Sequence, residues 1–263
     1  MIFSHQSTEP SFSERRPVLA VVIIELLLLL AVLAGGTIAT IKQLDYTSPV
    51  LISFIPIALV LIIYLTIRRR WQMIGFRSLR NIPAVHAKYY IPLLLVLGTL
   101  SLKGFGEINL SKAVFFIFFT LLVAFVEETI YRGLIFKTLL QKSAVTAVVI
   151  SSILFSITHL LNALSGQNVT DTIVQLVYAL LLGALLALLM LKNGNIIPLV
   201  LFHFIHNLIQ FLSNDLQDKG TIPYDLFILI TLAASCVWLI QSFRRPSSLS
   251  LVKRNEEQHR AAD

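Results

Sequence analysis

Long apolar runs separated by short polar segments are the feature that most constrains this chain. Eight such runs occupy residues 17–41, 49–67, 89–103, 111–137, 144–163, 171–191, 195–213 and 222–243. A helix of about 20 apolar residues can cross the hydrocarbon core of a bilayer. Of the 263 residues, 56% are hydrophobic and 13% are charged, whereas soluble domains carry about 25% charged residues. The sequence therefore predicts an all-α, polytopic transmembrane helical bundle with about eight spans, and it excludes a water-soluble globule.

We expect three parts along the chain. Residues 1–105 hold N-terminal transmembrane helices and a basic interfacial segment, residues 106–243 hold the helices that carry polar motifs, and residues 244–263 form a polar cytoplasmic tail. In the first part, residues 71–88 mix basic and apolar side chains. That mixture predicts a helix lying on the lipid headgroups.

The distribution of basic residues predicts the orientation. In a soluble protein, a net charge of +7 would suggest a nucleic-acid partner. Here the Lys and Arg residues lie mainly in the segments between the apolar runs, so we expect no nucleic-acid partner. With eight spans, sixteen of the 21 Lys and Arg residues fall on the side that holds both termini. Four fall on the other side, and Arg132 lies within a span. Because basic residues concentrate on the cytoplasmic side, we predict that both termini are cytoplasmic.

Ionisable side chains inside a span cost about 2.5–3.5 kcal/mol each on insertion scales, so each one calls for an explanation. In the run 111–137, Glu127 and Glu128 are adjacent, and Tyr131 and Arg132 follow four residues after each. On a helix, residues four apart are neighbours. Arg132 can therefore neutralise Glu128, which leaves Glu127 available for chemistry.

Two further runs carry polar groups. His159 follows Phe155 by four residues in 144–163, while His203 and Asn207 share one face of 195–213 and His206 points nearer a different face. If Glu127, His159, His203 and Asn207 converge in one cavity, a carboxylate and an imidazole can deprotonate a water, and N–H groups can stabilise an oxyanion. Alternatively, histidines and a carboxylate could bind zinc with one open position.

Two isolated residues are interpreted as structural. Glu25 stands alone in the first run, with no second polar group on that helix, and the only cysteine, Cys236, lies in an apolar run.

Three motifs in this order resemble those of the CPBP family of membrane proteins. EETIYR at 127–132, FSITH at 155–159 and HFIHN at 203–207 match EExxxR, FxxxH and HxxxN. The resemblance covers residues 110–210, the four-helix core of that family, and no motif position departs from it. The family includes type II CAAX prenyl endopeptidases and proteins linked to bacteriocin self-immunity.

The resemblance implies an intramembrane endopeptidase, in a bacterial cell membrane, that cleaves a membrane-associated peptide such as a CAAX-type end. Carried over by position, Glu127 is the water-activating base assisted by His159, and His203 and Asn207 stabilise the oxyanion. Glu128 and Arg132 are the supporting pair, with Tyr131 and Phe155 beside them. A metal-free mechanism is favoured, and zinc held by Glu127, His159 and His203 is the alternative.

Two other classes of protein were weighed. A non-catalytic immunity or scaffolding protein could use the same helices to bind a partner, but no motif residue is lost. A proton transporter would also place Glu and His inside the membrane, but transporters often contain internal repeats, and the two halves of this chain do not resemble each other.

Overall fold

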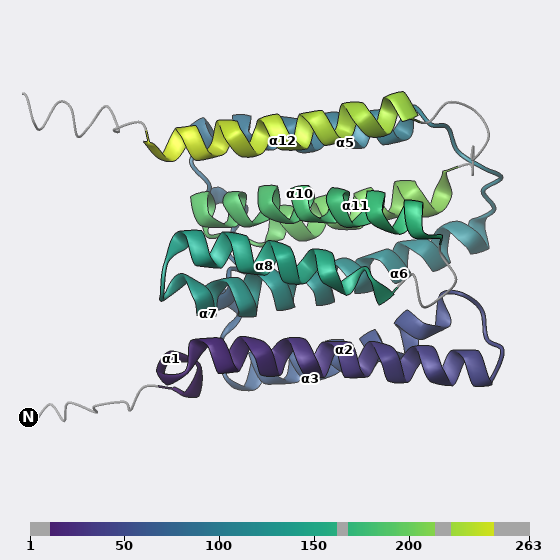
Figure 1. Ribbon diagram of the computed structural model, residues 1–263, viewed down its shortest axis with the longest axis horizontal. Coiled ribbons are helices and arrows are strands. Elements are labelled where there is room, and N and C mark those ends of the chain that lie inside the picture. Colours follow the sequence, from purple (N-terminus) through teal and green to yellow (C-terminus); the bar gives the residue numbers. More distant parts are fainter. Residues whose placement is uncertain (1–10, 162–167, 214–221, 245–263) are drawn as a thin grey trace, which may run out of the picture.

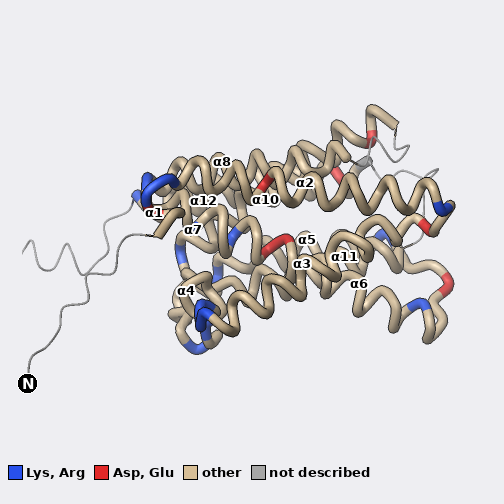
Figure 2. Tube along the Cα trace, turned by 90° about the horizontal axis from the view of Figure 1, so that it is seen from below, with Lys and Arg blue, Asp and Glu red and all other residues tan. Residues whose placement is uncertain are grey.

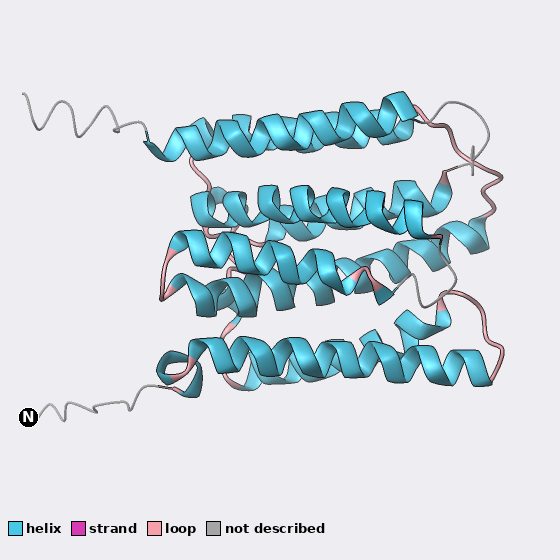
Figure 3. Ribbon diagram, viewed as in Figure 1, coloured by secondary structure: helices cyan, strands magenta, loops and turns pink. Residues whose placement is uncertain are grey.

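The computed structural model describes residues 11–161, 168–213 and 222–244, and within them the chain is helical with no strand (Figure 3). The elements, in chain order, are α1 (Phe12–Arg15), α2 (Pro17–Ile41), α3 (Ser48–Ile67), α4 (Trp71–Ile74), η1 (Leu79–Asn81), η2 (Ala84–Tyr90), α5 (Ile91–Ser101), α6 (Leu110–Glu128), η3 (Thr129–Ile135), α7 (Phe136–Leu140), α8 (Ala144–Thr158), α10 (Val169–Asn193), α11 (Ile197–Leu212) and α12 (Ile222–Arg244).

A helix occupies each of the eight apolar runs, which confirms the all-helical membrane architecture. Within the described residues, six helical stretches are long and apolar enough to cross a bilayer, whereas α8 and α11 have 15 and 16 residues. At 1.5 Å per residue these two helices are about 22–24 Å long, shorter than the roughly 30 Å hydrocarbon core. The count of eight spans therefore stays a prediction.

The helices run antiparallel and stack in layers (Figure 1). α5 and α12 form one layer, α10 and α11 lie next to it, and α2 with α3 form the opposite layer beyond α6 and α8. The first and last described helices begin and end at the same end of the bundle. Figure 2 shows basic residues gathered at that end, near α1 and α4. This arrangement agrees with the predicted even number of crossings, and the cytoplasmic orientation stays a prediction.

The prediction of one interfacial helix at 71–88 is wrong. The chain there forms α4, η1 and η2, because Gly75 adopts a left-handed φ of 112° and Pro83 precedes η2. The segment packs on the turn between α10 and α11. The Ile196 amide donates to the Gly75 carbonyl at 2.9 Å, and His86 Nδ1 lies 2.7 Å from Asn193 Oδ1.

Small residues line the contact between α8 and α10. Ser152 and Ser156 on α8 face a row of Ala179 and Gly183 on α10, all of them buried. The Ser156 hydroxyl donates to the Leu176 carbonyl across this contact at 2.7 Å. Because helices in lipid associate through packing and hydrogen bonds, small residues that allow close approach stabilise the pair.

Gly183→Ala is expected to destabilise the protein by about 1–3 kcal/mol, because an added methyl group overfills a packed contact. A Cβ at Gly183 would lie 3.1 Å from Phe155 Cδ1 and 3.6 Å from Arg132 Nη2. Gly36→Ala on α2 is the control, since a Cβ there meets nothing within 4 Å. Thermal unfolding in detergent should show a lower Tm for Gly183→Ala and an unchanged or higher Tm for Gly36→Ala. Equal Tm values would contradict the close contact.

Cysteine labelling tests the topology. In a Cys236→Ser background, Asp45→Cys and Gln141→Cys place one thiol in the exposed loop at either end of the bundle. An impermeant maleimide applied to intact cells should label the Asp45→Cys protein, and the Gln141→Cys protein only after permeabilisation, because the basic end is expected to be cytoplasmic. Labelling of both proteins in intact cells would contradict an opposed placement of the two loops.

Candidate active site

A π-helical turn follows the two adjacent glutamates. α6 ends at Glu128, and Thr129–Ile135 continue the helix with π geometry before α7 begins. The sequence predicted an uninterrupted α-helix over 111–137, so this turn is a correction. Insertion of such a turn changes the angular spacing of side chains, and π turns often occur at functional sites. Here the wider turn contains Tyr131 and Arg132 of the first motif.

Glu128 and Arg132 form a fully buried ion pair, as their i,i+4 spacing predicts. Arg132 Nε lies 3.4 Å from Glu128 Oε2, and both side chains have 0% exposure. Arg132 Nη2 also donates to the Gly183 carbonyl at 3.3 Å, and the guanidinium lies 4.5 Å from the centre of the Phe155 ring. The arginine therefore joins η3 to both α8 and α10.

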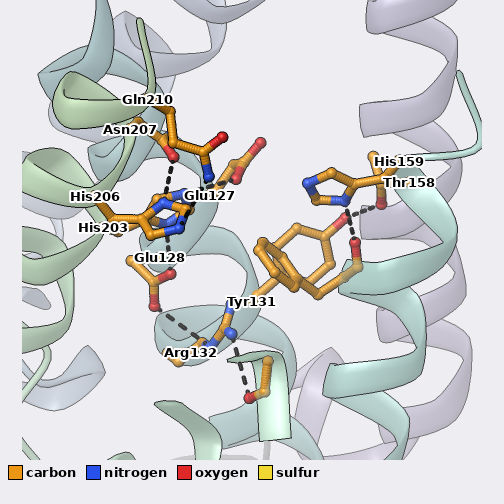
Figure 4. Close-up of polar contacts among 12 residues, drawn as sticks. Glu127, Glu128, Tyr131, Arg132, Thr158, His159, His203, His206, Asn207 and Gln210 are labelled. Carbon is orange, nitrogen blue, oxygen red and sulfur yellow. Dashed lines mark hydrogen bonds and ion pairs between the residues drawn. The ribbon is translucent and has the colours of Figure 1, made fainter. Parts of the chain in front are cut away.

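His203 on α11 lies between the two glutamates. Its Nδ1 is 2.8 Å from Glu128 Oε1, and its Nε2 is 3.4 Å from Glu127 Oε2 (Figure 4). The Glu127 side chain is 15% exposed, whereas the Glu128 side chain is fully buried. The two adjacent carboxylates are thus differentiated by the fold: one is buried against a guanidinium, and the other is accessible and shares only the histidine.

His159 lies in the turn that ends α8. Its Nδ1–H donates to the Phe155 carbonyl at 2.9 Å, which leaves Nε2 as the nitrogen with a lone pair. The Phe155 ring packs edge-on against the His159 and His203 rings, at centroid distances of 5.1 and 6.0 Å. In Figure 4 the Glu127 carboxylate is drawn between His203 and His159.

Asn207 is oriented by its neighbour His206. His206 Nδ1–H donates to Asn207 Oδ1 at 2.9 Å, and His206 Nε2 accepts from Gln210 at 3.1 Å and from the Tyr178 hydroxyl. Because the amide oxygen is occupied, the NH₂ group of Asn207 is the part that can donate to another group.

Tyr131 points away from this group of side chains. Its hydroxyl contacts Thr158 and lies 3.5 Å from Glu25 Oε1, while its ring packs edge-on against Phe155 at 5.2 Å. Tyr131 is therefore tied to α2 and α8 and supports the Phe155 ring.

The structure brings Glu127, Glu128, Arg132 and His203 into direct contact, and it places His159 and Asn207 on either side of them. Sequence reasoning missed several polar partners: Glu25, Thr158, Tyr178, His206 and Gln210. The sequence shows no second polar group on the helix of Glu25, because its partners, Thr158 and Tyr131, lie on other helices. His206 was assigned to a different face, yet its ring nitrogen reaches the neighbouring Asn207 side chain.

The zinc alternative requires Glu127, His159 and His203 to converge on one point. Within the described residues, no group of three or more His, Cys, Asp or Glu side chains is placed to hold a metal ion. Nδ1 of His203 and Nδ1 of His159 have hydrogen-bond partners, as the second ring nitrogen of a zinc-bound histidine also does. The metal-free mechanism and its zinc alternative both stay predictions, and no step of the mechanism below uses a metal.

The fold and these contacts define an integral membrane protein whose buried helices carry a Glu–His cluster. Residues 109–209 match the family model described as "Type II CAAX prenyl endopeptidase Rce1-like". The match contains all three motifs, supports the assignment of the chain to the CPBP family, and supports peptidase activity at the level of the family. No curated protein matches the chain.

Arg132→Ala should lower the free energy of unfolding by about 3–5 kcal/mol, because it leaves the buried Glu128 carboxylate without its cation. Thermal unfolding of the purified protein measures the loss. Arg80→Ala is the matched control, since Arg80 is exposed at the basic end and its removal should change stability by about 0.5 kcal/mol or less. An Arg132→Ala protein that accumulates and unfolds like the wild type would show that the ion pair contributes nothing.

Proposed function

We propose that the protein is an intramembrane endopeptidase in which Glu127 activates a water for attack on a peptide bond. The observation that carries the proposal is the difference between the two glutamates. Glu128 is buried against Arg132, whereas Glu127 is partly exposed and lies 3.4 Å from His203 Nε2. A carboxylate that is reached by water and not paired with a guanidinium can accept a proton. His159, through its Nε2 lone pair, assists by accepting a hydrogen bond from the same water.

Charge balance supports this assignment. With His203 protonated, the guanidinium and the imidazolium offset the two carboxylates, so the cluster is neutral as a whole. Unpaired charges are costly in a low-dielectric interior, whereas paired and hydrogen-bonded ones are tolerated. A protonated His203 donates from Nδ1 to Glu128 and presents Nε2–H toward the side where Glu127 lies.

His203 and Asn207 are proposed to stabilise the oxyanion formed when water attacks the carbonyl carbon. The Nε2–H of His203 and the NH₂ group of Asn207 are donors on the same helix face, one turn apart. Preorganised donors of this kind are worth the most where charge develops in the transition state. The contact of Glu128 with His203, and that of His206 with Asn207, hold both donors in place.

The substrate is proposed to be a membrane-associated peptide, and the family description suggests a prenylated CAAX-type end. An apolar cavity of about 290 Å³ lies between α2, α3 and η3, lined by Ile24, Leu28, Pro56, Val60 and Ile130 among others. Ile24 and Ile130 precede Glu25 and Tyr131 in the chain. The cavity therefore lies near Glu25 and Tyr131, and its apolar lining has the chemistry to hold a lipid chain.

Glu127→Gln should abolish proteolysis while preserving the fold, because it keeps the shape of the side chain and removes the base. We expect a fall in kcat of at least about 10²-fold, and about 10²–10³-fold for Asn207→Ala. The assay uses purified protein in liposomes with matched prenylated and unprenylated peptides. Glu107→Gln, at an exposed position, is the control and should retain full activity. A Glu127→Gln protein that still cleaves, or one that keeps a full cellular phenotype, would favour the partner-binding immunity or scaffolding role.

Chelation distinguishes the two catalytic versions. If the reaction is metal-free, turnover should be unchanged after dialysis against a zinc chelator and unchanged on addition of zinc. Loss of activity on chelation with recovery on addition of zinc would replace this mechanism by one in which Glu127, His159 and His203 are ligands.

A further inference from the structure

A third carboxylate reaches the site from a helix outside the segment that matches the family model. Glu25 lies on α2, within the run VVIIELLLLL, and is 6% exposed. α2 lies outside residues 109–209. A carboxylate in an apolar membrane helix is costly to insert and marks a candidate functional position. The proposed mechanism above does not use it.

Glu25 contacts two hydroxyl groups of the catalytic segment. Its Oε1 is 3.3 Å from Thr158 Oγ1 and 3.5 Å from the Tyr131 hydroxyl, and these two hydroxyls also contact each other. Thr158 is the residue before His159, and Tyr131 is in the π turn after Glu127 and Glu128. One side chain of α2 thus reaches both motifs.

The fold does not require this carboxylate to satisfy its partners. The Thr158 hydroxyl also has the Leu154 carbonyl at 2.9 Å, and the Tyr131 hydroxyl has Thr158. Glu25 Oε2 is buried without a hydrogen-bond partner among the described residues. Buried polar groups that are left unsatisfied are rare and call for an explanation. If Glu25 served only to join helices, a serine or threonine could make the hydrogen bond, at a lower free-energy cost of insertion into the membrane than a carboxylate.

We propose that Glu25 is a positioning residue for the histidine that assists catalysis, an inference that rests on the proposed endopeptidase function. Glu25 contacts Thr158 and Tyr131, the Tyr131 ring packs against Phe155, and the Phe155 carbonyl and ring hold His159. Displacement of these two hydroxyls moves the His159 ring relative to Glu127. The site therefore depends on α2 as well as on the matched core.

Kinetics of Glu25 variants test the proposal. Glu25→Leu removes the unsatisfied carboxylate, so its Tm should equal or exceed that of the wild type, while kcat falls at least tenfold and KM changes less than twofold. Glu25→Gln keeps a polar group of the same shape and should retain kcat within about threefold. A lower Tm, with a loss of activity in proportion to the loss of folded protein, would mean that Glu25 only joins helices and would overturn the proposal.

Two threonines provide a matched control. Thr158 and Thr120 both donate to the carbonyl four residues earlier on their own helix, but only Thr158 contacts Glu25. Thr158→Val should lower kcat and should add little to the effect of Glu25→Leu, since both changes break the same contact. Thr120→Val should leave kcat unchanged. Additive effects of Thr158→Val and Glu25→Leu would overturn the proposal.

A second measurement does not depend on cleavage. Diethyl pyrocarbonate labelling, quantified for each histidine by mass spectrometry, should show the His159 rate changed at least threefold in Glu25→Leu. The rate at His86, which is bonded to Asn193 at the basic end, should be unchanged. Unchanged labelling at His159 overturns the proposal. Absence of cleavage by the wild type overturns the endopeptidase function instead, while the labelling still decides the role of Glu25.

Discussion

The buried ion pair between Arg132 and Glu128 is the interaction on which the rest of the site depends. A guanidinium and a carboxylate with no exposure are tolerated only if each has partners. Arg132 has the Gly183 carbonyl and the Phe155 ring, and Glu128 has His203 Nδ1. These contacts tie η3 to α8, α10 and α11, the helices that carry the other motifs. The charge pair therefore fixes the relative positions of helices whose apolar surfaces alone would specify them poorly.

The same pair separates the roles of two adjacent glutamates. Because Glu128 is buried against Arg132 and Glu127 is not, only Glu127 combines access to water with contact to a histidine. The π turn that follows lets Tyr131 reach α2 and Arg132 reach α10 from one short segment. Close packing of α8 against Gly183 leaves room for the guanidinium, whereas an added methyl group would press on Phe155 Cδ1 at 3.1 Å. Packing and charge act on the same few residues.

The hydrogen-bond pattern decides which atom of each polar side chain donates and which is left to contact another group. His159 donates through Nδ1, His206 donates to Asn207, and His203 is shared between two carboxylates. In a medium without water, each such contact is strong and each unsatisfied atom is costly. Five buried side-chain atoms have no hydrogen-bond partner among the described residues: Glu25 Oε2, Glu128 Oε2, Thr129 Oγ1, and Arg132 Nε and Nη1. Of these, only Glu25 Oε2 belongs to the N-terminal helices, and it marks the point where they meet the motif helices.

The sequence by itself determined the membrane class, the eight apolar helices and the Glu128–Arg132 pair, because apolar length and i,i+4 spacing act locally along the chain. The three motifs also indicated which residues would gather. Only the tertiary structure decided that His203 lies between the two glutamates, that Tyr131 reaches Glu25, and that His206 orients Asn207. Most of these contacts join residues far apart in the chain, and the angles depend on a π turn and on close approach at Gly183. No local periodicity encodes that geometry, since it results from how several helices pack together.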